Sequence, residues 1–395
     1  MEFKDLNINE NICEALKKQD ITNPTEIQAK LIPSMLDGKD IIAKSQTGSG
    51  KTLSYLIPIF MKIDTSVRGT QAIILTPTHE LASQVHRQAE LLNKNAGTDI
   101  KSVLIIGGAN IVRQIEKLKE KPQIVIGSAG RILDLIKKRK IQAHLVKTII
   151  IDEADRMLDR LNIDGVNDVI KTTLKNSRQT VILSASMNKA TFKAAEAIMN
   201  EPVIIKGKEE VPEKIKHYYI TCEKRDKIVL VRKIMAGLKP EKVMLFINDT
   251  FAIEEIVEKL NYHGLKATGI YGAAKKRERL KAIDDFREGR CNILVSSDIT
   301  SRGMDFENVD IVINIDIPEE PVFYQHRAGR TGRGNKSGTV ISLISATEKK
   351  WINKYENTFG IKFEQKEMSY GKLQNPTKKH IPEIKSAPKT KKISK

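Results

Sequence analysis

The chain has 395 residues, of which 40% are apolar and 29% are charged, so it is long enough for two α/β domains and too polar for a membrane protein. Lys and Arg (67) exceed Asp and Glu (49) by 18 charges, which favours a polyanionic partner through counterion release, although this charge could also serve solubility. The three separated cysteines, Cys13, Cys222 and Cys291, predict neither a disulfide framework nor a zinc site. Without a secretory signal or a spanning apolar stretch, we expect a cytoplasmic protein with no membrane partner.

Short apolar runs alternate with helix-length segments in the first half of the chain. The expected strands are residues 40–44, 71–76, 102–106, 123–126, 148–151 and 180–183. These runs are nearly continuous Ile, Val and Leu, so we expect both faces of the sheet to be covered. The alternation predicts a parallel, doubly wound α/β sheet.

The same alternation restarts after Pro202. The expected strands are residues 216–221, 243–247, 267–271, 292–296, 311–315 and 339–343. We therefore predict one domain at residues 1–207, a polar linker at 208–213 and a second domain at 214–370. Residues 371–395 are predicted to be a basic, disordered tail, because its last part holds many lysines and one acid, Glu383. The tail could bind nucleic acid loosely or could only solubilise the chain.

A glycine-rich string follows the first predicted strand and precedes a predicted helix at residues 53–62. The string is Ser45-Gln46-Thr47-Gly48-Ser49-Gly50-Lys51-Thr52. Gly48 and Gly50 let backbone N–H groups wrap around phosphate oxygens, and the helix N-terminus adds partial positive charge. Lys51 can reach the β- and γ-phosphates, and Thr52 can offer its hydroxyl to Mg²⁺. The string predicts a phosphate loop, although Ser45 stands where that motif usually begins with Gly, and a simple Gly-rich turn would look similar.

An apolar strand ending in carboxylates comes about one hundred residues later, at Asp152-Glu153-Ala154-Asp155. Asp152 is placed to hold Mg²⁺, largely through water, and Glu153 could polarise an attacking water. Read alone, the acids could equally be a helix N-cap after a buried strand. Together with the phosphate loop, they predict a second element of the same site.

Three arginines and several glycines lie close together in the second half, in the string that runs from His326 to Gly334. Arg330 and Arg333 could stabilise charge on a transferred phosphoryl group from the other domain. A basic surface loop is the alternative. The string from Ser297 to Asp305 follows another apolar strand and is a weaker signal, because an ordinary strand-to-helix turn looks similar.

Taken together and in this order, these strings resemble the DEAD-box RNA helicases from about Phe3 to about Gly360. The resemblance implies two tandem RecA-like domains, each a doubly wound parallel sheet with helices on both faces. It also implies that Phe3 stacks on adenine and that Gln28 pairs with the adenine edge. Residues 45–52 would hold the phosphates, and Asp305 would contact the ribose.

The resemblance assigns the remaining residues to coupling and to RNA. Those that would link the ATP site to strand separation are Asp155, Ser184, Ser186 and His326. Those that would contact RNA are Pro77, Thr78, Gly108, Arg131, Arg279 and Ser297. Members of this family hold the sugar–phosphate backbone, so no base preference is expected, and contacts to the 2′-hydroxyl would favour RNA over DNA.

The chain departs from the family pattern mainly in RNA-facing and coupling motifs. The departures are Asp20, His79, Ser128, Ala129, Ser186, Tyr271, Lys276 and Ser297. His79 stands where the family usually has Arg, which removes a permanent cation, whereas Lys276 replaces Gln and supplies one. Apart from Asp20, these changes lie outside the direct ATP contacts.

The resemblance thus implies an ATP-dependent RNA helicase with ATP and Mg²⁺, acting as a monomer. ATP and RNA would draw the two domains together, and the closed RNA surface would bend one strand of a short duplex until the duplex opens locally. Two alternatives stay open. One is an RNA-clamping platform with little unwinding, and the other is a DNA-directed translocase on the same two-domain plan.

Overall fold

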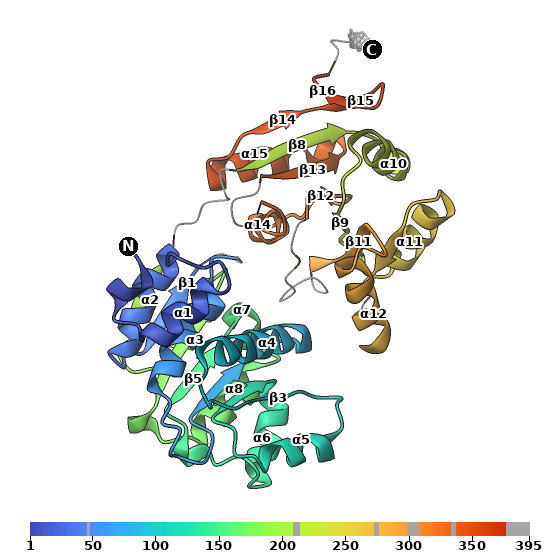
Figure 1. The fold of residues 1–395 in the computed structure, drawn as a ribbon. Helices are drawn as coiled ribbons and strands as arrows, with labels where there is room; N and C mark the ends of the chain where they lie inside the picture. The colour runs from blue at the N-terminus through green and yellow to red at the C-terminus, as the bar shows by residue number, and fades with distance from the viewer. Residues whose placement is uncertain are drawn as a thin grey trace, which may run out of the picture.

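The computed structural model describes residues 1–45, 48–207, 214–271, 276–298, 306, 309–332 and 337–376. Figure 1 shows two lobes, each with a central sheet and helices on both of its faces. Some predictions concern residues outside the described ranges: Gln46, Thr47, Asp305, Arg333, the linker at 208–213 and the tail from 377 onward.

The first sheet has seven parallel strands in the order β3-β4-β2-β5-β6-β1-β7. Its strands are β1 Ile41–Lys44, β2 Ala72–Leu75, β3 Ser102–Ile105, β4 Ile124–Gly127, β5 Thr148–Ile151, β6 Gln179–Ser184 and β7 Val203–Lys206. All six predicted strands are present. The edge strand β7 was not predicted, because it is short and lies between Pro202 and Gly207.

Helices cover both faces of this sheet. One face carries η1 Phe3–Leu6, α1 Glu10–Lys17, α2 Glu26–Leu36, α3 Lys51–Lys62 and α4 His79–Ala96. The other carries α5 Ile111–Leu118, α6 Ala129–Lys137, η2 Ala143–Leu145, α7 Ala154–Met157, α8 Ile163–Lys171, η3 Lys175–Ser177 and α9 Lys189–Glu196. Consecutive strand residues alternate between the two cores: Ile150 packs in one, and Ile149 and Ile151 pack in the other.

The second sheet also has seven parallel strands, in the order β10-β11-β9-β12-β13-β8-β14. Its strands are β8 Ile215–Thr221, β9 Val243–Phe246, β10 Ala267–Gly269, β11 Ile293–Ser296, β12 Ile311–Asn314, β13 Gly338–Ile344 and β14 Phe363–Gln365. With β8 counted as its first strand, the order is the same as in the first sheet, so the chain repeats one topology twice. The predicted fold, two doubly wound parallel sheets, is confirmed.

The second sheet is also covered on both faces. One core contains side chains of α12 Lys276–Arg287, α14 Pro321–Ala328 and α15 Lys349–Phe359. The other contains side chains of α10 Lys227–Leu238 and α11 Ala252–Tyr262. Short turns η4 Lys224–Asp226 and η5 Ala346–Glu348 precede α10 and α15.

A short hairpin follows the second sheet. Its strands are β15 Glu367–Ser369 and β16 Lys372–Gln374, which pair antiparallel. Met368 and Leu373 pack against the core that includes α10. Residues 372–374, which the sequence placed in the basic tail, therefore belong to an ordered element.

Candidate active site

The predicted ATP-site residues of the first domain gather at the carboxyl ends of neighbouring strands. Ser45 directly follows β1, Ser184 ends β6, and Asp152 directly follows β5. Because β6 lies between β1 and β5, the phosphate loop and the acidic string face each other across one strand. Carboxyl ends of strands in an open α/β sheet are where ligands of this fold class bind.

The phosphate loop is held by contacts among its own residues. The Lys51 ammonium donates to the carbonyl oxygen of Ser45 at 2.6 Å, and the Ser45 hydroxyl donates to Ser49 Oγ at 2.8 Å. Gly48 and Gly50 have φ angles of 82° and 91°, which side-chain-bearing residues rarely adopt. α3 begins at Lys51, directly after Gly50. This is the strand, glycine turn and helix that phosphate binding requires.

Buried opposite charges face each other at this site. Burial lowers the pKa of the Lys51 ammonium, while the carboxylates of Asp152, Glu153 and Asp155 act in the opposite direction. Burial likewise raises the pKa of the Asp152 carboxyl, against the effect of Lys51. Glu153 has a φ of 51°, a left-handed conformation that costs about 1–3 kcal/mol for such a residue and is typical of functional turns.

Tyr55 is a site residue that the sequence reasoning missed. Its hydroxyl donates to Asp152 Oδ2 at 3.0 Å, and both residues are buried. Burial raises the pKa of the Tyr55 phenol well above its usual value, so it stays protonated and can donate. The available signal was its position one helical turn after Lys51, which places both on one side of α3.

The predicted adenine-reading segment is tied to the phosphate loop. Gln28 is 2% exposed; its amide nitrogen donates to the Gly50 carbonyl at 3.1 Å, and its amide oxygen accepts from the Thr25 N–H at 2.8 Å. The Thr25 hydroxyl donates to the Ser49 carbonyl at 2.7 Å. Phe3 is 3% exposed and belongs to the core on this face of the sheet, so its stacking on adenine stays a prediction.

Three of the four predicted coupling residues meet in one hydrogen-bonded group. The Ser184 hydroxyl donates to Asp155 Oδ1 at 2.6 Å, and the Ser186 hydroxyl donates to Asp155 Oδ2 at 3.0 Å. The hydroxyls of Ser184 and Ser186 are therefore the donors that bind the Asp155 carboxylate. His326 lies on α14 in the second domain, and its predicted link to Asp155 stays a prediction.

Arg330 is the residue of the second domain whose charge acts on the phosphate-loop lysine. Its side chain is 3% exposed, and its charge acts on Lys51, lowering the pKa of that ammonium. A guanidinium that acts on the phosphate-loop lysine lies where it could also reach a phosphate bound there.

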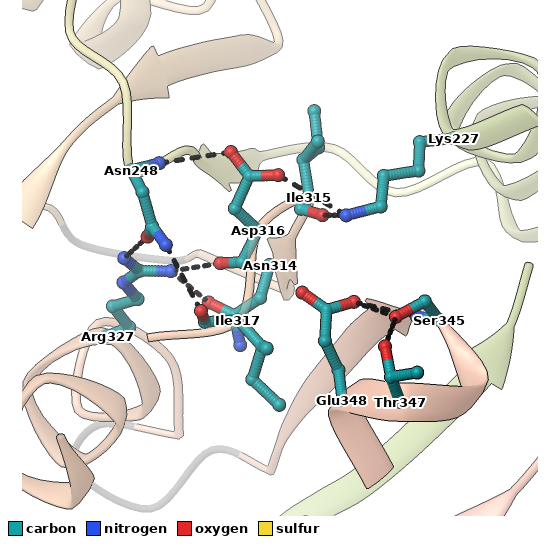
Figure 2. A network of polar contacts seen from close by, with 10 residues as sticks. All are labelled: Lys227, Asn248, Asn314, Ile315, Asp316, Ile317, Arg327, Ser345, Thr347 and Glu348. Atoms are coloured by element: carbon teal, nitrogen blue, oxygen red, sulfur yellow. Dashed lines mark hydrogen bonds and ion pairs between the residues drawn. The ribbon is translucent and has the colours of Figure 1, made fainter. Parts of the chain in front are cut away.

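Arg327, three residues earlier, makes a buried network within the second domain (Figure 2). It is 1% exposed and makes a two-point ion pair with Asp298 at 2.7 and 2.6 Å. It also donates to Asn248 Oδ1 at 2.8 Å and to the Asp316 carbonyl at 2.6 Å. These bonds connect α14 to the ends of β9, β11 and β12, and so they fix the segment that presents Arg330.

The predicted RNA residues of the first domain also come together. Thr78 caps α4 by accepting from the Leu81 N–H at 3.2 Å, and Arg131 donates to the Ala109 carbonyl at 3.3 Å, next to Gly108. A Cβ added at Gly107 would lie 3.8 Å from His79 Nε2, so the α4 start and the loop after β3 are neighbours.

One ion pair joins the two domains at their RNA-facing motifs. Arg279 NH2 of α12 lies 3.2 Å from Glu80 Oε1 of α4, and both side chains are mostly buried. The sequence predicted Arg279 as an RNA contact but did not anticipate Glu80 as its partner. Ser297, the other predicted RNA residue of this domain, is 2% exposed.

Family models match both halves of the chain: that of the DEAD/DEAH box helicases at residues 25–194 and that of the helicase conserved C-terminal domain at residues 226–335. A DEAD-box ATP-dependent RNA helicase CshC of Bacillus cereus is 41% identical over 91% of this chain and 91% of its own length. The chain belongs to the DEAD-box helicase family. The predicted family is thus confirmed. The probable ATP-dependent RNA helicase YfmL of Bacillus subtilis is 37% identical over 89% of the chain and 93% of its own length.

Solved structures of DEAD-box proteins are similar to this chain over most of its length. Dbp5 of S. cerevisiae bound to RNA and ADP BeF3 matches with a TM-score of 0.83 at 27% identity, covering 92% of this chain and 95% of that one. A DEAD box protein from Methanococcus jannaschii matches with a TM-score of only 0.57 at 33% identity, covering 92% and 99%. Over the whole chain, the structure is therefore more similar to the RNA- and nucleotide-bound Dbp5 than to the Methanococcus jannaschii protein, although its sequence identity to Dbp5 is lower.

Within the described ranges, no helix has the length and apolar character needed to cross a membrane. The same residues contain no group of three or more His, Cys, Asp or Glu that could hold a metal. Mg²⁺ is usually held by one or two carboxylates, waters and substrate phosphates. Asp152, which is buried and accepts from the Tyr55 hydroxyl, is a carboxylate that fits such a role.

Proposed function

We propose that this DEAD-box protein is an ATP-dependent RNA helicase, in which RNA-stimulated ATP hydrolysis is coupled to domain closure and to local unwinding of short RNA duplexes. The observation that carries the proposal is the arrangement around Lys51. The carboxylates of the first domain act electrostatically on this lysine, and so does the guanidinium of Arg330 from the second domain. Neither domain alone contains all of these groups.

The roles of the residues follow from their positions. Lys51 would release Ser45 to bind the β- and γ-phosphates, and Glu153 would accept a proton from the attacking water. Arg330 and Arg333 would stabilise charge that develops on the transferred phosphoryl group. Asp152 and the Thr52 hydroxyl would hold Mg²⁺, largely through water, and the ion would supply positive charge next to the phosphates. Gln28 would select adenine at the mouth of the same loop.

RNA would run across both domains. One surface of the first domain contains Thr78, Gly108 and Arg131. Arg279 of the second domain lies next to this surface, because it pairs with Glu80 at the start of α4. Phosphate oxygens would compete with Glu80 for Arg279. Action as a monomer in the cytoplasm stays a prediction.

The proposal is tested with the full chain in an RNA-stimulated ATPase assay. Lys51→Ala should abolish ATP turnover. Glu153→Gln should keep ATP binding, lose hydrolysis and remain on RNA as a long-lived closed complex. Lys171→Ala, at an exposed lysine of the same domain, is the control and should leave turnover unchanged. Normal turnover by Glu153→Gln would exclude it as the general base.

Strand displacement separates the helicase from the RNA-clamping platform. Short RNA duplexes should open in repeated rounds in the presence of ATP, whereas Glu153→Gln, which closes without turnover, should open about one duplex per molecule at most. ATP-dependent RNA binding with no displacement would favour the clamp instead. Stronger stimulation of the ATPase by single-stranded DNA than by RNA would favour the translocase.

A further inference from the structure

A cavity of about 400 Å³ lies at the edge of the first sheet, away from the predicted RNA surface. We call it the β7 groove. Its lining residues are Ile42, Lys44, Met187, Asn188, Lys189, Phe192, Lys193, Glu196, Ile204 and Lys206. None of the roles proposed for ATP or RNA uses these side chains.

Strand register builds the floor of the groove. β1 and β7 pair in parallel, with Ile42 opposite Ile204 and Lys44 opposite Lys206. Alternate residues of a strand share a face, so all four side chains lie on the side of the sheet that α9 covers. α9 is only eight residues long, and Ile204 is left 49% exposed. The floor is therefore an apolar sheet face that the protein's own helix does not fully cover.

The charged side chains around this floor are mainly cationic. Four lysines line the groove, two from the strands and two from α9, against a single acid, Glu196. Lys44 and Lys206 are direct cross-strand neighbours, an arrangement of like charges that is unfavourable in itself. The α9 N-terminus, whose cap Asn188 accepts from the Thr191 N–H at 2.8 Å, adds partial positive charge at the same place.

We propose that the β7 groove binds an acidic peptide segment of a partner protein, with apolar side chains seated on Ile42, Ile204 and Phe192 and carboxylates paired with the lysines. Charge complementarity selects this occupant. A second copy of this chain, at +18, would be repelled, and so would the chain's own lysine-rich end.

Other ligand classes fit the groove less well. Single-stranded RNA sites use aromatic platforms and Arg, whereas this groove has one aromatic residue and no Arg among its lining residues. Metabolite sites fix their ligand with buried polar groups, whereas Lys189, Lys193 and Lys206 stand exposed at the rim. Exposed lysines above an apolar floor suit a peptide with acidic and apolar side chains.

The test is a selection from an unbiased hexapeptide display library on the full-length protein, with depletion on the double variant Ile204→Asp/Lys206→Glu. The strongest peptide is then synthesised, and its Kd is measured by fluorescence anisotropy. Lys193→Glu is a second groove variant that leaves the sheet untouched. Leu161→Asp and Lys171→Glu are the controls, since these side chains are exposed but do not line the groove. RNA-stimulated ATPase activity verifies that each variant is folded.

We expect selected peptides rich in Asp, Glu and apolar residues, with affinity about tenfold weaker in either groove variant and unchanged in both controls. Methyl NMR signals of Ile42 and Ile204 should shift when the peptide is added. The proposal is overturned if no peptide is enriched over the double variant, if groove and control variants bind alike, or if RNA crosslinking rather than peptide binding is lost in the groove variants. Methyl shifts caused by Glu209→Lys/Glu210→Lys without peptide would assign the groove to the chain's own linker and would also overturn it.

Discussion

Tyr55 donates its hydroxyl hydrogen to Asp152 Oδ2 at 3.0 Å, which ties α3 to the end of β5 inside the first domain. Lys51, the residue that begins α3, lies at the end of the predicted phosphate loop, and Asp152, the residue after β5, carries the carboxylate that we propose holds Mg²⁺. The phenol therefore fixes the distance between the two halves of the ATP site. It also stabilises the ionised form of Asp152, whose pKa is raised by burial.

Replacing Tyr55 with Phe removes this donor without changing the ring. The pKa of Asp152 should rise further, because the hydrogen bond to the ionised carboxylate is lost. Since Asp152 acts in its ionised form, the acidic limb of the pH profile of kcat should move to higher pH, while turnover at alkaline pH changes less. A pH series of RNA-stimulated ATPase rates measures this shift. An unmoved acidic limb would show that Tyr55 only packs.

The Glu80–Arg279 pair should help to hold the domains together. Charge reversal at either residue should open the domains in the absence of RNA, and Glu80→Arg/Arg279→Glu should restore part of the closed population. Exposed ion pairs contribute about 0.2–1 kcal/mol, and this pair, mostly buried, should lie at the upper end. Single-molecule FRET between dyes on the two domains reports the populations. Equal effects of the single and double variants would mean that the pair carries no coupling.

Arg327 should be a stability residue of the second domain. Arg327→Ala leaves the carboxylate of Asp298, 19% exposed, without its partner, and the cost should lie toward the lower end of the about 3–5 kcal/mol that breaking a buried pair costs. Arg327→Lys should not restore stability, because an ammonium cannot reproduce the two-point contact. Urea unfolding provides the measurement, and Arg225→Ala, an exposed site in the same domain, is the control. A loss no larger than that of the control would contradict the network's structural role.

Local signals in the sequence predicted most of the fold and of the ATP site. Asp152 and Glu153 could be placed because they come directly after the buried strand β5, and Lys51 because it ends the glycine turn that follows β1. β7 was missed because it is a four-residue run between Pro202 and Gly207, and β14 because its three residues carry little apolar pattern.

Relationships between distant segments could not be predicted from local pattern. The partner of Arg279 depends on how two separately folded domains meet, and no spacing rule connects it to Glu80. The burial of Phe3 depends in the same way on how η1 packs against the first domain. Tyr55 could have been predicted from the sequence, because it lies one helical turn after Lys51. Its acceptor, Asp152, directly follows β5, so this contact depends on the order of the strands in the sheet.

We propose that ATP is hydrolysed between the domains, with Arg330 completing a site that the first domain cannot complete alone. Arg330→Ala in the full chain, assayed for ATP affinity and for RNA-stimulated turnover, is the decisive variant. We expect nearly unchanged ATP affinity and a loss of about 10³-fold or more in kcat, as for arginine fingers in general. Turnover within about threefold of the unaltered protein would contradict it.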